Sequence, residues 1–188
     1  EELVKDIEQH IENKNDAELT TLFQDVHYAD IAEIINELDD DEATYLIKLL
    51  DSDKTSDILT ELDEDIREAI LGNLSSQEIA SELEELDTDD AADIIGELPK
   101  EQVQDVISKI EDREHAKDIV DLLRYAENSA GGLMAKELVK VNENWNVLTC
   151  VKEMRAQAEN VTRVHSIYVV DDEDKLKGRL SLKDLLTT

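Results

Sequence analysis

A leucine or isoleucine recurs every twelve positions through much of this chain. Eight consecutive units of twelve residues, from His27 to Leu122, end in one of these residues and carry another at their ninth position. Positions five, eight, nine and twelve are mostly apolar and stand in the i, i+3, i+4, i+7 relation, which places them on one face of a helix. The repeat therefore predicts a series of short helices, each with one apolar face.

The first position of each unit indicates where a helix begins. It holds Asp, Ser or Pro in six of the eight units, and we expect Asp39, Asp51, Asp63 and Asp87 to be helix caps. Helices of about nine residues are not stable alone, so they must pack on one another in succession. The fold class is thus mainly α: an α-solenoid superhelix, right-handed or similar, with a 24-residue helix-pair repeat. One or two capping helices are expected before it, within residues 1–26.

Acidic residues far outnumber basic ones in the repeat region. The chain has 49 Asp and Glu against 19 Lys and Arg, and residues 27–122 alone hold 31 acidic and 7 basic side chains. Such a surface repels nucleic acid and anionic membranes, and favours cations as partners. Residues 130–188, by contrast, hold nine of each sign. This break, next to Gly131 and Gly132, predicts two domains, at residues 1–128 and 129–188.

The pattern after the two glycines is that of a small α+β unit. Strands are expected at residues 137–141, 166–170 and 176–180, and a helix is expected at residues 147–158. The helix should turn Val147, Leu148, Val151 and Met154 inward. A short last helix should follow Ser181, which gives the order strand, helix, strand, strand, helix. About sixty residues make a small core, so pairing with a second copy is expected.

No enzyme chemistry is indicated by the sequence. It contains no phosphate-binding glycine loop, no HExxH motif and no cluster of Cys and His, and we expect His115 to be packed. Cys150 is the only cysteine, which excludes an internal disulfide framework and leaves an inert core thiol. No apolar run approaches the ~18 residues that span a bilayer. With no signal peptide at its start, we expect the chain to be cytoplasmic.

Two stretches resemble known families. SIYVVDDEDKLKGRLSLKDLL, at residues 166–186, resembles the second half of a cystathionine β-synthase (CBS) domain. AGGLMAKELVKV, at residues 130–141 and directly after an acidic helical array, resembles the junction of the MgtE family of magnesium transporters. The resemblance implies an acidic superhelix, a pair of CBS domains, a connecting helix and a membrane pore. Only the first CBS domain is present here.

The resemblance also implies a setting and partners. The chain would be the cytoplasmic portion of an integral protein of a bacterial inner or plasma membrane. It would form a homodimer through its CBS domains and contact the missing second CBS domain and the pore of the same protein. Magnesium ions would be its regulatory ligand.

Four residues align with positions that hold divalent ions in that family. The resemblance implies ligands at Asp57, Asp89 and Asp93 and at the backbone carbonyl of Gly132. Asp89 and Asp93 are also four residues apart, so they share one helix face, and magnesium prefers oxygen ligands. The alternative is that the acids of this stretch are favoured only by the helix dipole.

Ser181 and Asp184 match the CBS motif that holds a nucleotide ribose, which implies an ATP site. The same pair is also an ordinary capping box. Lys183 stands where the resemblance favours Arg, and Ser166 leaves Tyr168 without a second aromatic neighbour to hold a base. These two departures weaken the case for a nucleotide.

Three functions follow from these patterns. In the first, which we favour, Mg²⁺ ions bridge the acidic faces of the superhelix and the CBS domains and promote a compact, pore-closing state. Basic residues would be scarce because internal ion pairs would neutralise those faces. In the second, the superhelix is a protein-binding scaffold and its charge only keeps it soluble. In the third, the CBS unit senses adenine nucleotides.

Overall fold

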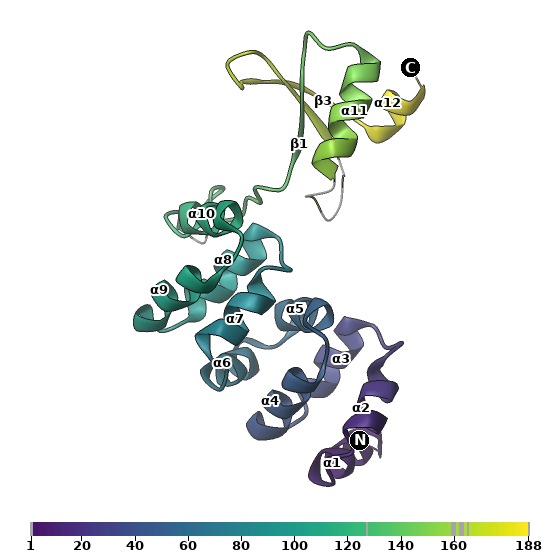
Figure 1. The fold of residues 1–188 in the computed structure, drawn as a ribbon, viewed down its shortest axis with the longest axis vertical. Coiled ribbons are helices and arrows are strands. Elements are labelled where there is room, and N and C mark those ends of the chain that lie inside the picture. Colours follow the sequence, from purple (N-terminus) through teal and green to yellow (C-terminus); the bar gives the residue numbers. More distant parts are fainter. Residues whose placement is uncertain (1, 127, 159–160, 162–163, 165, 188) are drawn as a thin grey trace.

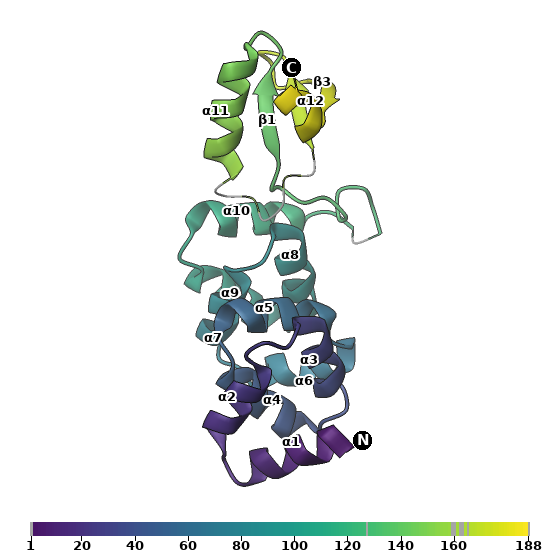
Figure 2. The ribbon, with the colours of Figure 1, turned by 90° about the vertical axis from the view of Figure 1, so that its right-hand side faces the viewer.

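The computed structural model describes residues 2–126, 128–158, 161, 164 and 166–187. The molecule is elongated, with the two termini at opposite ends (Figure 1). Figure 2 shows the same arrangement from the side: helices stack one after another, and a small sheet lies beyond the last of them. The predicted fold class, a helical superhelix followed by a β-α-β-β-α unit, is confirmed.

Ten short helices build the superhelical part. They are α1 (Glu2–Glu12), α2 (Asp16–Phe23), α3 (Tyr28–Ile35), α4 (Asp40–Leu49), α5 (Ser52–Glu61), α6 (Glu64–Gly72), α7 (Ser76–Leu83), α8 (Thr88–Glu97), α9 (Lys100–Lys109) and α10 (Arg113–Leu122). From α3 onward, most helices contact the helix two places along, as in α3 with α5 and α8 with α10. The repeating unit of packing is therefore a helix pair. The first two helices pack on each other, and α1 packs on α4, as expected of caps.

The apolar face of each unit forms one continuous core. Ile35, Leu59, Leu83, Ile95 and Ile119, all at the ninth position, are fully buried. Burying one such side chain is worth about 1.5–3 kcal/mol. Because no single helix buries its own face, this stabilisation belongs to the stack as a whole.

The predicted caps are right in position but mostly wrong in hydrogen bonding. Asp39 accepts hydrogen bonds from two amides in the first turn of α4. Asp51, Asp63 and Asp87 stand at the N-cap positions of α5, α6 and α8 in extended backbone, but make no cap hydrogen bond there. At α8, the Glu137 carboxylate accepts a hydrogen bond from the amide of Thr88, the first residue of the helix.

The C-terminal unit consists of β1 (Val139–Asn142), α11 (Val147–Gln157), β2 (Ile167–Val170), β3 (Leu176–Leu180) and α12 (Leu182–Thr187). β1 pairs in parallel with β2, and β2 pairs antiparallel with β3. The domain boundary predicted at residues 128 and 129 falls between α10 and β1 and remains a prediction. No helix in the described ranges is both long enough and apolar enough to cross a membrane.

Two residues of α11 that were expected inward are exposed. Leu148 is 83% exposed and Val147 is 39% exposed, whereas Cys150 and Met154 are buried. Leu148 precedes Cys150 by two residues, a step of about 200° around a helix, so the two cannot share a face. Val147 lies on the inward side, but in the first turn, at the edge of this small core.

Candidate functional site

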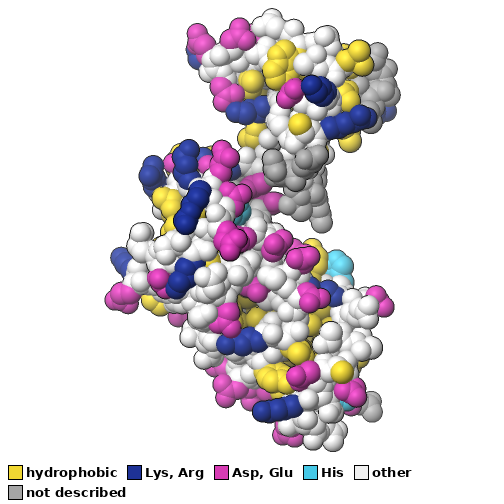
Figure 3. All heavy atoms as spheres, in the orientation of Figure 1, with side chains coloured by type: hydrophobic (Ala, Val, Ile, Leu, Met, Phe, Trp, Pro, Cys, Tyr) yellow, Lys and Arg dark blue, Asp and Glu magenta, His cyan; other side chains and the backbone are white. Residues whose placement is uncertain are grey.

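Helix α8 holds the most acidic stretch of the superhelix. Asp87 is at its N-cap position, Asp89 and Asp90 are in its first turn, and Asp93 follows one turn later. Ala91 and Ile95 are fully buried. They fix the inner face of the helix, so the carboxylates stay on its outer side. Figure 3 shows Asp and Glu side chains along the whole superhelix, with Lys and Arg side chains among them on the part nearest the C-terminal unit.

The carboxylate of Asp90 is surrounded by other carboxylates of this region. Its pKa is raised to about 6, first by loss of hydration against the surrounding protein and then by the nearby carboxylates of Asp89, Asp87, Asp93 and Asp57. Asp57 belongs to the neighbouring part of the superhelix, on α5. The three acids predicted as ligands therefore all act on one carboxylate. A cation at this place would relieve their mutual repulsion.

A cleft of about 510 Å³ opens beside α8. Its lining includes Asp93 of α8, Glu64 and Arg67 of α6, and Gly132 from the segment after α10. We call it the α8 cleft. Two of the four predicted ligand residues, Asp93 and Gly132, are thus brought to one cavity, whereas Asp57 and Asp89 are not among its lining residues.

Arg67 occupies one wall of the α8 cleft. It forms a two-point ion pair with Glu97, with Nε to Oε2 at 2.8 Å and Nη2 to Oε1 at 2.5 Å. Its Nη1 also donates to the carbonyls of Leu59 and Leu62, at 3.1 and 2.9 Å. Hydrogen bonding to Glu97 is the main reason that the pKa of Arg67 is raised. Glu97 is therefore already neutralised by protein, which leaves Glu64 and Asp93 as the other carboxylates of the cleft.

Sequence reasoning missed Glu64, Arg67 and Glu97. The available signal was Arg67 itself, which stands at the fifth position of its unit, on the face that most other units fill with apolar residues. A charged residue on a buried face needs a partner. The identity of that partner was not accessible, because Glu97 is 30 residues away in sequence.

The acidic surface is not a finished metal site in this chain. Within the described ranges, no group of three or more His, Cys, Asp or Glu side chains is placed to hold a metal ion. Mg²⁺ keeps several waters and is usually held by one or two carboxylates.

Ser181 and Asp184 lie together at the start of α12. Ser181 Oγ donates to Asp184 Oδ2 at 2.6 Å and accepts from the Asp184 amide at 3.1 Å. The capping arrangement is thus formed, and both side chains remain exposed. A small pocket of about 110 Å³, lined in part by Ser166 and Tyr168, lies at the beginning of β1 and β2. Since β2 begins where β3 ends, this pocket and Ser181 are at the same end of the sheet.

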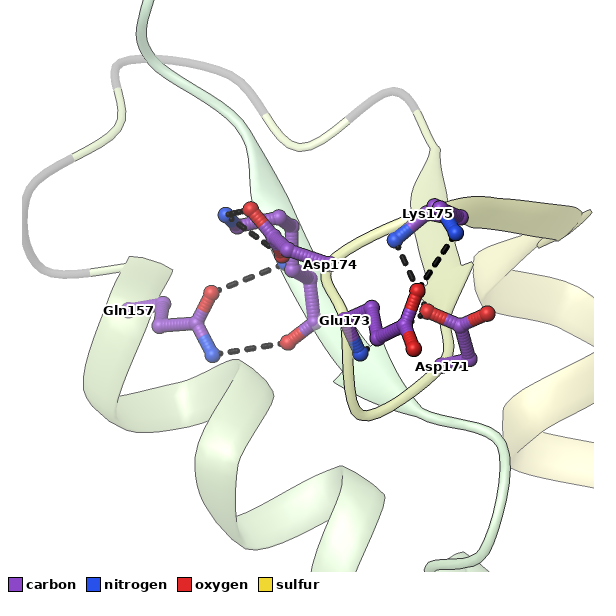
Figure 4. A network of polar contacts seen from close by, with 6 residues as sticks. Gln157, Asp171, Glu173, Asp174 and Lys175 are labelled. Carbon is purple, nitrogen blue, oxygen red and sulfur yellow. Dashed lines mark hydrogen bonds and ion pairs between the residues drawn. The ribbon is translucent and has the colours of Figure 1, made fainter.

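The acidic turn between β2 and β3, at the other end of the sheet, is matched by lysines. Lys140 of β1 pairs with Asp174 at 2.8 Å, Lys177 pairs with Asp171 at 2.9 Å, and Lys175 pairs with Glu173. Figure 4 shows this network without Lys177, and in it the Gln157 side chain bridges both backbone groups of the β1 lysine. The ion pairs join the turn to β1 and β3, and Gln157 joins α11 to β1.

His115 and Cys150 have the structural roles that were expected. His115 Nε2 lies 3.0 Å from the carbonyl oxygen of Leu83, so the ring is in hydrogen-bond contact with the end of α7. Cys150 is 5% exposed, and burial raises the pKa of its thiol.

Family models match both parts of the chain. The MgtE intracellular N domain matches residues 26–128, and the CBS domain matches residues 130–188. A magnesium transporter MgtE from Thermus thermophilus is 39% identical over 82 residues, covering 39% of this chain and 18% of that protein. A magnesium transporter MgtE from Enterococcus faecalis is 36% identical over 73 residues, covering 39% and 16%. The aligned part thus spans less than a fifth of either relative.

Two solved structures resemble the whole chain. The crystal structure of the soluble part of a magnesium transporter has a TM-score of 0.79 at 27% identity, covering 100% of this chain and 73% of the other. The cytosolic domain of the Mg²⁺ channel MgtE in complex with ATP has a TM-score of 0.87 at 28% identity, covering 98% and 75%. Both comparisons include the superhelix and the C-terminal unit in the same order.

Proposed function

The chain belongs to the family of the MgtE intracellular N domain, and on that premise we propose that it is the cytosolic magnesium-sensing region of an MgtE-type transporter or channel. Divalent ions would bridge the acidic face of the superhelix to the CBS domains and stabilise a compact, pore-closing state. The observation that carries this proposal is the gathering of Asp57, Asp89 and Asp93 around Asp90, on the helix that borders the α8 cleft.

The physical basis is repulsion between like charges. Two carboxylates ~4 Å apart at an effective dielectric near 20 oppose each other by about 4 kcal/mol. Several such pairs keep two acidic surfaces apart when no divalent ion is present. A divalent ion between the surfaces turns this repulsion into attraction. A shift from 1:99 to 99:1 needs about 5.5 kcal/mol of differential binding. A few bridging ions suffice for that.

The remaining ligands would come from outside this chain. Asp93 and the carbonyl of Gly132 would contribute from the α8 cleft, and Asp57 and Asp89 from beside it. We infer that another acidic surface, such as that of a further CBS domain, completes the ion sites, because the described acids alone form no coordination group.

Exposed apolar side chains support pairing of the C-terminal unit. Leu148 and Leu176 are 83% and 66% exposed, and Trp145 is 43% exposed. Such exposed apolar side chains mark an interaction surface, and we propose that a second CBS domain and a second copy of the protein cover it.

The test is a magnesium titration of the folded chain against sodium at matched ionic strength, followed by amide chemical shifts. The double variant Asp89→Ala/Asp93→Ala should raise the magnesium concentration at mid-response roughly tenfold, the equivalent of 1.4 kcal/mol. The matched control Asp40→Ala/Asp41→Ala removes two exposed first-turn acids of α4 and should leave the midpoint unchanged. Equal shifts in both double variants would show that magnesium acts only as a general counter-ion.

A second candidate function is adenine-nucleotide binding by the CBS unit. It is supported by the ATP complex of the similar MgtE structure and by the small pocket that lies at the same end of the sheet as Ser181 and Asp184. That pocket, at about 110 Å³, is smaller than the ~300 Å³ of the smallest usual ligand sites, so a second CBS domain would have to enlarge it. Calorimetry with ATP should detect heat that Asp184→Ala abolishes. Titrations without heat in the chain joined to its second CBS domain would exclude this function.

A further inference from the structure

The segment between α10 and β1, residues 123–138, is fastened to the start of α8. Glu137 accepts two hydrogen bonds from Thr88: its Oε1 from the amide at 3.0 Å and its Oε2 from the side-chain hydroxyl at 2.9 Å. The amide of Lys136 donates to the same Thr88 hydroxyl at 3.2 Å. Thr88 is 1% exposed. The first helical residue of α8 is thus held by two consecutive residues of this segment, which we call the junction segment.

Two further contacts hold the junction segment on the superhelix. Lys136 Nζ lies 2.6 Å from Asp121 Oδ2 of α10, and this hydrogen bond lowers the pKa of Asp121. Met134 packs against the core of the superhelix. The segment is therefore anchored on both α8 and α10 from Met134 to Glu137.

The C-terminal unit begins immediately after this anchor. Val139 is the first residue of β1 and is 1% exposed in the core of the sheet. An extended chain advances ~3.3 Å per residue, so only about 7 Å of backbone separates the Glu137 bonds from that core. Such a short connection leaves β1 little freedom to move relative to Glu137. While the Glu137 bonds stand, the position of β1 follows that of α8.

Loss of these bonds would change the connection between the two parts. If the contacts of Lys136 and Met134 were lost as well, the sixteen residues of the junction segment would act as a tether. A flexible chain of that length has an end-to-end distance of roughly 22 Å. The Glu137 bonds are the anchor nearest to β1, so without them β1 is held to the superhelix only through Lys136 and Met134.

We propose that Glu137 is a positioning residue that couples the CBS unit to α8. It contributes no ligand to the ion. It sets where the acids of α8 stand relative to the C-terminal unit, and so where a bridging ion finds its partner surface. Its part in ion sensing rests on the proposed function, whereas the coupling of the two parts does not.

The coupling is tested by pulsed electron spin resonance in the absence of magnesium. Spin labels are placed at Lys100→Cys on α9 and Lys152→Cys on α11, both exposed, in a Cys150→Ala background. The parent chain should give one narrow distance distribution, and Glu137→Ala should at least double its width. Glu143→Ala removes an exposed carboxylate of the same unit and should leave the distribution unchanged. An unchanged width in Glu137→Ala, with helix content retained by circular dichroism, would overturn the proposal.

Thr88 provides a second, independent pair of variants. Thr88→Val removes the hydroxyl donor and should broaden the distribution, while Thr88→Ser keeps both donors and should restore it. A general loss of folding would not separate valine from serine in this way. Equal distributions for the two variants would count against the coupling.

A magnesium titration of the same labelled chains separates the two proposals. If the parent chain ignores magnesium while Glu137→Ala broadens the distribution, the proposed function fails and the coupling stands. If the parent chain responds and Glu137→Ala matches it throughout, the coupling fails and the proposed function stands. Our account predicts a response in the parent chain and a midpoint at least threefold higher in Glu137→Ala.

Discussion

Polar residues that interrupt the apolar face of the repeat mark contacts between neighbouring turns of the superhelix. Each of three such residues finds its partner about one helix pair away: Arg67 with Glu97, His115 with the carbonyl of Leu83, and Glu82 with the Ser52 hydroxyl. The sequence showed that these positions were exceptions. It could not show their partners, because the partners lie 30 to 32 residues away and are chosen by packing.

Arg67→Met should lower the free energy of unfolding by about 2 kcal/mol. The change leaves Glu97 and two backbone carbonyls without their donor in a mostly buried place, where breaking such a pair is costly. Urea unfolding followed by circular dichroism measures this. The control is Arg124→Met, whose ion pair is exposed and worth little, so a loss of the same size there would refute the assignment.

Asp90→Asn should stabilise the chain at pH 7.5 and have little effect at pH 4.5. The pKa of Asp90 is about 6 in the folded chain, above the ordinary 3.8, so the folded state binds a proton first as the pH falls. Its charged form therefore disfavours folding above pH 6, and this penalty fades between pH 6 and 4. Solvent screening keeps the effect small, a rise in melting temperature of roughly 2 °C. Scanning calorimetry without divalent ions at both pH values checks this, and a rise that is larger at pH 4.5 would contradict it.

At the scale of elements, two of the basic residues of the superhelix, Lys54 and Lys48, donate to carbonyls at helix ends. Lys54 Nζ donates to the carbonyls of Phe23, Gln24 and Val26, at 2.7, 2.9 and 3.3 Å, where α2 ends. Lys48 donates in the same way to the carbonyl of Asn73 at 3.1 Å, after α6. A cation is favoured at these carbonyls.

Lys54→Met should loosen the α1–α2 pair and leave the rest of the superhelix intact. Hydrogen bonds from a charged donor are worth about 1.5–3 kcal/mol, so amide protection in residues 2–26 should fall roughly tenfold or more. Hydrogen exchange read by mass spectrometry measures this by segment. Lys5→Met, an exposed change on α1, is the control. A uniform loss of protection across residues 28–122 would show that Lys54 acts on the whole superhelix.

The positions of the helices could be predicted from nearby residues in the sequence. The residues that depart from the pattern could not. The twelve-residue period and the first-position residues gave most helix starts, because both act within one turn. Leu148 was misplaced because two neighbouring apolar residues of one helix cannot both face a small core. The cap of α8 was missed because its acceptor, Glu137, is 49 residues from Thr88.

At the scale of the whole molecule, the candidate site is a product of the arrangement of helices. Asp93 and Gly132 meet in the α8 cleft because the chain returns past α8 after α10. A repeat pattern predicts such stacking but not which side chains face a cavity. The ligand set Asp57, Asp89, Asp93 and Gly132 accordingly remains a prediction.

The central claim is that divalent ions, and not charge screening, draw the acidic superhelix and the CBS unit together. Small-angle X-ray scattering of the chain through a millimolar magnesium titration, against sodium at matched ionic strength, tests it most directly. The account predicts a radius of gyration that falls with magnesium and not with sodium. Identical curves for the two ions would contradict it and favour a protein-binding scaffold.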